Sequence, residues 1–198
     1  MPDAEANLGF LWQKVFQQVH IALVDNKVVD NESAVALSIV GYKDKDFPLG
    51  NQLRLLAVSE DVLQELDIHS WLNRLSDYCH IKPIKPVPSD VTQYARFMQK
   101  RVKGEGRIHT QLLKKAKHIS EKFNIDYEKC LAELKVKNKY VESKLPFITV
   151  ESQQTKKQLK PGESSKFLLF IEQTLFDKPS DGKFDCYGLS KTATVPWF

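Results

Sequence analysis

Hydrophobic and polar positions in the first half of the chain follow two different periods. Residues 8–24 carry apolar side chains at helical spacing, whereas residues 33–40 alternate as a strand does and residues 52–58 indicate a second strand. Residues 59–75 return to the helical period, and residues 78–84 indicate a third strand. This order predicts a ferredoxin-like βαββαβ unit without its first strand.

The missing strand would be central in a ferredoxin-like sheet, so its absence would leave backbone groups unpaired. No residue before Leu8 has strand character. We expect that the chain begins late relative to the natural protein; the alternative is an unusual sheet. The helix over residues 59–75 has a predicted N-cap at Ser59, with Glu60 and Asp61 complementing the helix dipole.

The second half predicts two helices followed by strands. Helical spacing covers residues 107–123, and Asp126 is placed to cap a second helix over residues 127–136. Strands are predicted at residues 147–151 and 166–173, joined by a polar loop over residues 156–165. Two short segments, residues 184–187 and 194–198, close the chain.

A proline-rich connector over residues 82–88 marks the predicted domain boundary. It divides the chain into residues 1–86, a ferredoxin-like (RRM-like) domain lacking its first strand, and residues 87–198, a C-terminal α+β domain with a basic helix. The predicted fold class is therefore α+β.

The charge is divided unevenly between these halves. The net charge is +4, but residues 1–90 have 8 Lys/Arg against 13 Asp/Glu, and residues 91–198 have 21 against 12. The polar face of the helix over residues 107–123 is basic, with Glu121 at its margin, and comprises Arg107, Gln111, Lys114, Lys115, His118 and Lys122. A solvent-exposed face more often mixes signs, so this sorting favours nucleic acid binding over a merely solvated helix.

Composition excludes several classes of protein. The chain has 198 residues, of which 42% are hydrophobic, and no apolar run approaches the roughly 20 residues needed to cross a bilayer. No secretory signal is evident, and the three dispersed cysteines indicate reduced thiols, so we expect a cytoplasmic protein with no membrane association. The histidines and carboxylates show no metal-ligand spacing and there is no phosphate-binding loop, so neither a metal nor another cofactor is expected.

RNA can be cut without a metal, because its own 2′-hydroxyl can act as the nucleophile. Such a reaction needs a base for the 2′-hydroxyl proton and positive charge near the phosphate. His20, at the end of the first apolar helix, has a side chain that titrates near neutral pH and could be this base. A single histidine on a helix is, however, more often structural.

The C-terminal run FDCYGLSKTATVPWF (residues 184–198) closely resembles the ending of the subtype I-F CRISPR repeat-processing endoribonucleases. The segment VHIALV (residues 19–24) is similar to the family's helix bearing the catalytic histidine. PFITVESQQT (residues 146–155) is similar to its strand carrying the catalytic serine. PLGNQLRLLAVSEDVLQEL (residues 48–66) is similar to its second hairpin strand and the following helix. The resemblance covers nearly the whole chain.

The resemblance implies three catalytic positions. His20 matches the general base, Ser152 the hydroxyl that positions the 2′-oxygen, and Tyr187 the residue that orients the imidazole. The implied reaction is a metal-independent transesterification that leaves a 2′,3′-cyclic phosphate and a 5′-hydroxyl. Without the resemblance, Ser152 would be a hydroxyl capping a turn at a strand end and Tyr187 a core aromatic residue.

The resemblance also implies a site for an RNA hairpin, in which the basic helix lies in the groove of the stem. The residues matched to RNA contacts are Arg107, Gln111, Lys114, Lys115, His118, Gln153, Gln154 and Phe167. Phe167 matches an aromatic side chain that stacks beneath the stem; its alternative is a core position. The family's base-reading Arg-x-Gln element lies in a linker; its nearest match, Arg96 to Gln99, is one residue longer.

The function implied is one cut at the 3′ base of the repeat stem-loop in precursor CRISPR RNA. The product then stays bound at the 3′ end of the guide RNA, together with other subunits of a type I-F DNA-targeting surveillance complex. One alternative is a non-catalytic scaffold subunit that caps the guide RNA. Another is a general basic nucleic-acid-binding protein, which would not prefer a hairpin.

Overall fold

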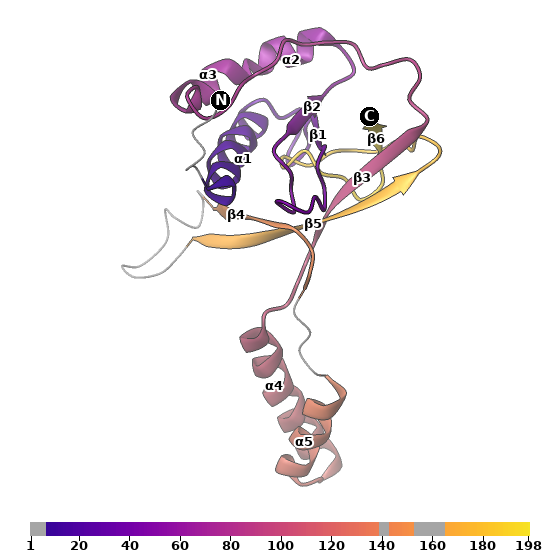
Figure 1. Cartoon of the computed structure of the whole chain (residues 1–198). Helices are drawn as coiled ribbons and strands as arrows, with labels where there is room; N and C mark the ends of the chain where they lie inside the picture. The colour runs from indigo at the N-terminus through magenta and orange to yellow at the C-terminus, as the bar shows by residue number, and fades with distance from the viewer. Residues whose placement is uncertain (1–6, 139–142, 153–164) are drawn as a thin grey trace. The chain divides into compact units, whose positions relative to one another are not determined.

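The computed structural model describes residues 7–138, 143–152 and 165–198. The chain forms two compact units, of which the first comprises Met1–Lys100 and Leu145–Phe198 and the second Arg101–Lys144 (Figure 1). The units do not follow the boundary expected between residues 86 and 87. Strands from both sides of that boundary share the core of the first unit, so the proline-rich connector does not separate two cores.

The first part of the chain contains a long helix, a β-hairpin and three short helical segments. These are α1 (Leu8–Asp25), β1 (Ala36–Ile39), β2 (Leu53–Leu56), α2 (Glu60–Leu66), α3 (Ile68–Leu72) and the 3₁₀ turn η1 (Asn73–Leu75). The single helix predicted over residues 59–75 is wrong, because Asp67 adopts a left-handed conformation (φ 41°) between α2 and α3. Ser59 occupies the N-cap position of α2, but its side chain makes no capping hydrogen bond.

The remaining strands of the first unit form an antiparallel sheet in the order β4-β5-β3-β6. Its members are β3 (Gln93–Lys100), β4 (Phe147–Glu151), β5 (Lys166–Phe176) and β6 (Val195–Trp197). The predictions for β4 and β5 are confirmed in place, although β5 runs three residues further than expected. The strand β6 lies within residues 194–198, the segment expected only to close the chain.

One strand prediction is wrong. Residues 78–84 form no strand; the segment contains Pro83, which lacks the backbone N–H that a sheet ladder requires. Residues 184–187 form a turn, in which Phe184 makes a single bridge to Ser33. The β3 segment, which was expected to be a linker, is instead an inner strand of the larger sheet.

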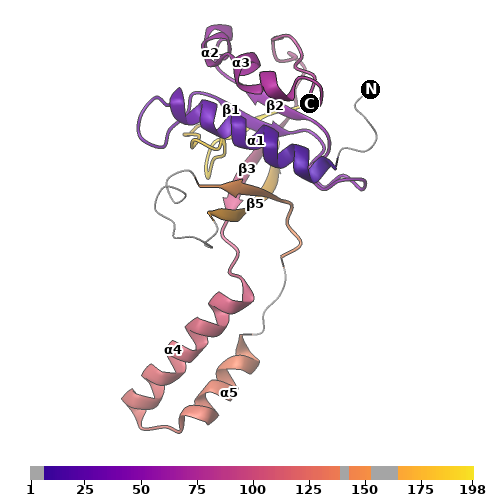
Figure 2. The same ribbon diagram turned by 90° about the vertical axis from the view of Figure 1, so that its left-hand side faces the viewer.

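One hydrophobic core joins α1 to both sheets of the first unit. The buried face of α1 consists of Trp12, Phe16, Val19, Ala22 and Leu23. It packs with inward side chains of β1, β3, β4 and β5, and Figure 2 shows α1 lying across these strands. The predicted helix over residues 8–24 is thus confirmed, and its apolar face holds it against the core.

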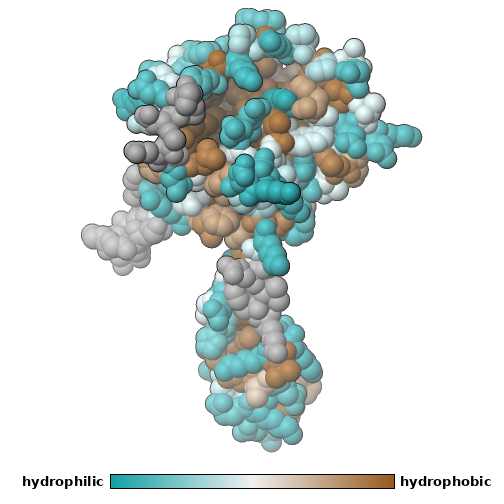
Figure 3. All heavy atoms as spheres, in the orientation of Figure 1, coloured by the Kyte–Doolittle hydropathy of each residue, from teal (hydrophilic) through white to brown (hydrophobic). Residues whose placement is uncertain are grey.

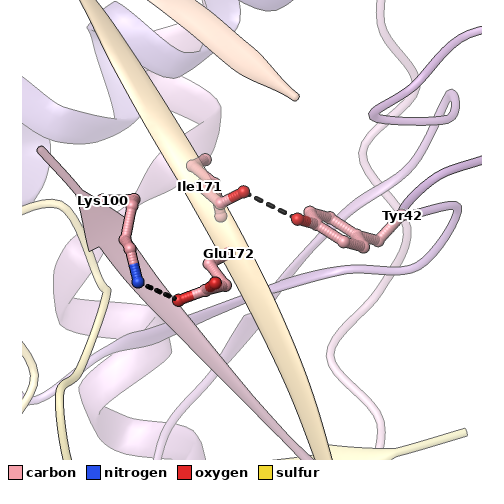
Figure 4. A network of polar contacts seen from close by, with 4 residues as sticks. All are labelled: Tyr42, Lys100, Ile171 and Glu172. Carbon is pink, nitrogen blue, oxygen red and sulfur yellow. Dashed lines mark hydrogen bonds and ion pairs between the residues drawn. The ribbon is translucent and has the colours of Figure 1, made fainter. Parts of the chain in front are cut away.

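Tyr42 ties the β1–β2 connection to the larger sheet. Its hydroxyl donates a 2.7 Å hydrogen bond to the Ile171 carbonyl on β5 (Figure 4). On the neighbouring strand β3, the Lys100 ammonium group forms a 3.0 Å ion pair with Glu172 of β5. The Tyr42 hydrogen bond links elements on either side of the proline-rich connector, in agreement with the shared core, whereas the ion pair joins two strands that both follow it.

The second unit is a pair of helices, α4 (Glu105–Phe123) and α5 (Tyr127–Lys137). They pack through Leu112, Ala116, Cys130, Leu131 and Leu134. Asp126 caps α5 as predicted, because its carboxylate accepts the Lys129 N–H at 2.8 Å. The face of this helix pair that Figure 3 shows is mostly hydrophilic around a smaller hydrophobic patch.

The fold is α+β, as predicted, with helices and antiparallel sheets. Its strands divide into the two-stranded sheet β1-β2 and the four-stranded sheet, and the described strands do not form one continuous ferredoxin-like sheet. The expectation of a missing first strand stays a prediction. Among the described residues, no helix has both the length and the apolar composition needed to cross a membrane.

Candidate active site

His20 lies on α1 at the margin of the helix's buried face. It follows Phe16 by one helical turn and is only partly exposed. The buried residues on either side fix the helix against the core, so the imidazole has a defined position beside the C-terminal turn. The sequence could place His20 near the end of a helix, but not opposite a particular partner.

The backbone carbonyl of Cys186 holds the His20 ring in place through a hydrogen bond to Nδ1. His20 Nδ1 lies 2.8 Å from this oxygen, which comes from a residue 166 positions later in the chain. A carbonyl oxygen only accepts hydrogen bonds, so the neutral imidazole carries its proton on Nδ1. Nε2 is then the nitrogen with a lone pair available to accept a proton.

Tyr187 stacks directly on His20. The two ring centroids are 4.1 Å apart and the ring planes differ by 11°. The same tyrosine ring is also nearly parallel to Phe16, at a centroid distance of 6.3 Å. The tyrosine therefore fixes the plane of the imidazole, while the Cys186 carbonyl fixes its rotation within that plane.

The turn that carries Tyr187 is built against β1. Gly188 has a φ of 68°, a conformation that glycine adopts without strain, and its carbonyl accepts the Leu37 N–H at 2.9 Å. A Cβ atom at this position would lie 2.4 Å from Leu37 Cγ. The glycine of the Tyr187-Gly188 pair is thus required by both backbone conformation and close packing.

The next residues of the motif fasten it to the larger sheet. The Ser190 N–H donates to the Phe97 carbonyl on β3 at 2.9 Å, and the Ser190 hydroxyl donates to the Lys183 carbonyl at 2.7 Å. Leu189 is buried in the shared core. Most of the C-terminal motif therefore serves to position the segment that faces His20.

Burial lowers the pKa of His20 below its ordinary value of 6.5, whereas the hydrogen bond to Cys186 and the charge of Asp185 act in the opposite direction. Burial raises the pKa of Asp185; its hydrogen bonds from Leu189 and Tyr187 and the charges of His20 and Lys191 oppose that rise. The lowered pKa increases the fraction of neutral imidazole near neutral pH, which is the form able to take a proton.

Ser152 lies directly after β4, at an end of the sheet that contacts α1. Its N–H donates to the Ser165 carbonyl at 3.0 Å, so the β4–β5 pairing continues through this residue. The preceding N–H, of Glu151, donates at 2.9 Å to Gln17 Oε1, one turn before His20 on α1. Strand alternation puts Ser152 on the same face as Val150, which is buried in the core with α1.

Phe167 also lies on this face of the sheet. It is paired with Val150 across β4 and β5 and packs, partly buried, against the shared core. The structure thus brings His20, Tyr187, Ser152 and Phe167 into one unit. Gln153 and Gln154, and the predicted loop from residue 156 up to residue 164, lie outside the described residues.

The family resemblance implies that Arg96 and Gln99 lie in a linker, but the structure places them on a strand. Both lie on β3, where they point to opposite faces, because Ala95 and Phe97 define the buried side. Gln99 shares that side, whereas Arg96 shares the outer side with Met98. The Arg96 guanidinium donates to the Lys191 carbonyl at 3.0 Å and lies 4.4 Å from the centre of the Phe176 ring.

The polar, mostly basic face predicted for the helix over residues 107–123 is confirmed as one exposed face of α4. Arg107, Gln111, Lys114, Lys115 and His118 are all exposed, whereas Leu112 and Ala116 are buried against α5. Lys103 donates to Gln111 Oε1 at 3.1 Å and adds a further positive charge to this face.

Sequence reasoning missed several residues that shape the His20 environment. Phe16 extends the ring stack, the Cys186 carbonyl fixes the tautomer, and the Asp185 carboxylate accepts two backbone N–H groups of the turn. Only the position of Asp185, two residues before Tyr187, could have suggested a side chain that bonds its own turn. Within the part of the chain that the structure describes, no three metal-ligating side chains come together.

Comparison with known proteins gives a consistent assignment. The family model described as "CRISPR-associated protein (Cas_Csy4)" matches residues 1–198. The chain is 28% identical over 199 residues to "CRISPR-associated endonuclease Cas6/Csy4" of Escherichia coli (strain UTI89 / UPEC), covering 100% of this chain and 95% of the relative. It is also 28% identical over 200 residues to the Pseudomonas aeruginosa (strain UCBPP-PA14) protein of the same name, with the same coverage. The chain therefore belongs to the Cas_Csy4 family of CRISPR-associated proteins.

Proposed function

We propose that this protein is a metal-independent endoribonuclease that cuts the repeat stem-loop of precursor CRISPR RNA at its 3′ base. The observation that carries the proposal is the His20 imidazole, whose Nδ1 proton is held by Cys186 and whose ring is stacked on Tyr187. The names of the two endonuclease relatives and the family match support the same activity.

In the proposed reaction, His20 Nε2 takes the proton of the 2′-hydroxyl next to the scissile phosphate. The 2′-oxygen forms a bond to phosphorus, and the bond between phosphorus and the 5′-oxygen breaks. The departing 5′-oxygen takes a proton from solvent and becomes a hydroxyl group, while the upstream product ends in a 2′,3′-cyclic phosphate. The protonated His20 then releases its proton to solvent. No net oxidation or reduction occurs, so the step needs no redox partner.

Ser152 and Tyr187 are proposed to position this step. Tyr187 keeps the imidazole plane fixed through the 4.1 Å stack. Ser152 is proposed to hold the attacking 2′-oxygen and to constrain its sugar; its position on the α1-covered face of β4 supports that role. Phe167, partly buried on the same face, is proposed to stack beneath the RNA stem. In-line attack depends on such fixed geometry, because a small displacement of a reacting group costs a large part of the rate.

The exposed basic face of α4 is proposed to bind the hairpin stem, and Arg96 is proposed to add a contact outside it. Lysine and arginine side chains in the groove of A-form RNA contact mainly phosphates. A surface that binds these phosphates before the cut binds them afterwards too. This supports product retention and a place at the 3′ end of the guide RNA, with other subunits of a type I-F surveillance complex.

A cleavage assay with a labelled repeat hairpin tests the proposal. The protein should shorten the hairpin in the presence of EDTA and should leave intact a matched hairpin with one 2′-deoxy nucleotide at the cut site, although both bind equally well. Sensitivity to EDTA, or cleavage of the deoxy substrate, would contradict the mechanism. Binding without cleavage of the all-ribose hairpin would favour the scaffold subunit instead.

A further inference from the structure

Asp185 controls the shape of the turn that faces His20. Its Oδ1 accepts the N–H of Tyr187 at 2.8 Å and the N–H of Leu189 at 3.1 Å. Its own N–H donates to the Leu189 carbonyl at 2.8 Å, and its carbonyl accepts the Gly188 N–H at 2.8 Å. One residue therefore makes four hydrogen bonds within a five-residue segment.

This segment supplies both groups that hold the imidazole. Cys186, which follows Asp185 directly, presents the carbonyl to His20 Nδ1, and Tyr187 presents the stacked ring. A change in the turn would thus move the hydrogen-bond acceptor and the aromatic ring together. The position of Asp185 gives its side chain an influence on His20 that needs no direct contact.

The Asp185 carboxylate also supplies a negative charge that acts on His20. Among the described residues, Asp185 is the charged group whose electrostatic interaction raises the pKa of His20. Cys186 and Tyr187 also face the imidazole, but burial raises the pKa of each, which keeps both uncharged near neutral pH. The positive charge of Lys191 and the N–H donors of the turn favour the charged form of Asp185. At the end of β4, which packs against α1, the carboxylate of Glu151 accepts the Ser165 hydroxyl.

We propose that Asp185 is a positioning residue for proton transfer to His20: its carboxylate holds the turn that orients the imidazole and stabilises the positive charge that the ring gains. This inference rests on the proposed function, in which Nε2 takes the 2′-hydroxyl proton. When that proton arrives, the imidazole becomes a cation in a largely buried place. A nearby fixed anion lowers the cost of forming this cation without itself taking the proton.

Two substitutions separate the two contributions. Asp185→Asn keeps an oxygen that can accept the Tyr187 and Leu189 N–H groups, but removes the charge. Asp185→Ala removes both the charge and the acceptor, which leaves partly buried N–H groups unpaired. The matched control is Asp30→Asn, which deletes one negative charge from an exposed residue whose charge acts on Cys186 but not on His20.

The test measures the pKa of His20 by NMR titration of its ring proton in the free protein, and single-turnover cleavage across pH. For Asp185→Asn we expect the His20 pKa to fall by about half a unit to one unit. The acid limb of the pH–rate profile should shift to lower pH by the same amount, and the plateau rate should drop about two- to fivefold. Hairpin affinity should match that of Asp30→Asn, which should keep the wild-type pKa and rate.

Asp185→Ala should lose more activity than Asp185→Asn and should melt several degrees lower, because its turn is also loosened. An unchanged His20 pKa or an unchanged cleavage rate in Asp185→Asn would overturn the proposal. If the wild-type protein failed to cut the hairpin, the proposed function would fall. The NMR titration would still decide whether the Asp185 charge acts on His20.

Discussion

The imidazole of His20 and the phenol ring of Tyr187 are stacked, with centroids 4.1 Å apart and planes 11° from parallel. One ring comes from the first helix and the other from the C-terminal turn, and the neighbouring Cys186 carbonyl completes the arrangement. Because both contacts come from one turn, the histidine is oriented by a part of the chain that is itself fixed to β1 and β3.

The ring stack predicts different results for two substitutions of Tyr187. Tyr187→Phe keeps the stacked ring and should keep the cleavage rate within about threefold of wild type. Tyr187→Ala removes the ring and should lower the single-turnover rate by about tenfold or more, since the imidazole is then held by one contact instead of two. Hairpin affinity should stay the same for both. Equal losses for the two variants would show that the hydroxyl group, and not the stack, matters.

The lowered pKa of His20 predicts the pH dependence of cleavage. The neutral ring is the active form of a general base, so the rate should rise with pH through the pKa of His20 and then level off. Burial moves this pKa below 6.5, so the midpoint in the free enzyme should lie below 6.5. Values of kcat/KM across pH 4.5–8.5 check this expectation. A midpoint clearly above 6.5 would mean that another group controls the rate.

The same shift predicts a pH dependence of stability. A histidine with a lower pKa in the folded state binds fewer protons there than in the unfolded chain. Its contribution to stability is therefore complete above pH 6.5 and is lost as the pH falls through the folded pKa. Urea unfolding of wild type and His20→Asn at pH 7.5 and pH 5 measures this. The decrease in stability between the two pH values should be smaller in the variant, and equal decreases would contradict the shift.

The basic face of α4 predicts a salt-dependent binding defect. Lys114→Ala combined with Lys115→Ala should weaken hairpin binding and reduce the slope of log affinity against log salt by about 0.9 per lost phosphate contact, on the scale for duplex DNA. The matched control is Lys135→Ala with Lys137→Ala, which removes the same charge from exposed positions of α5. An unchanged slope in the α4 variant, or an equal change in the control, would remove this face from the interface.

Patterns along the sequence predicted the long elements well, because a helix buries its own periodic face. The spacing of Trp12, Phe16, Val19 and Leu23 is enough to define α1, and the sorting of basic and apolar residues defines α4. The strands β1, β2, β4 and β5 were predicted from their own alternating or apolar patterns. Fold class therefore followed from local sequence.

The errors arose where tertiary contacts decide the local structure. In the inner strand β3 only Ala95 and Phe97 are buried, and the outer side carries Arg96 and Lys100 beside Met98, so the strand has no clear apolar alternation. The segment over residues 78–84 has strand-like composition but pairs with nothing in the described sheets. The break at Asp67 depends on a backbone conformation that residue spacing does not predict.

The candidate site shows the same division. The resemblance to a known family indicated His20, Ser152 and Tyr187, but neither the tautomer nor the ring stack follows from the sequence. Both depend on how a turn near the C-terminus meets the first helix. The contribution of Asp185 became visible only with the hydrogen bonds of that turn.

The most direct test of the account is the single-turnover cleavage rate of His20→Ala, measured alongside its affinity for the repeat hairpin. If His20 is the base, cleavage should fall by at least about a hundredfold while affinity stays within about twofold. Cleavage near the wild-type rate would contradict the account, and so would a loss of affinity large enough to explain the loss of cleavage.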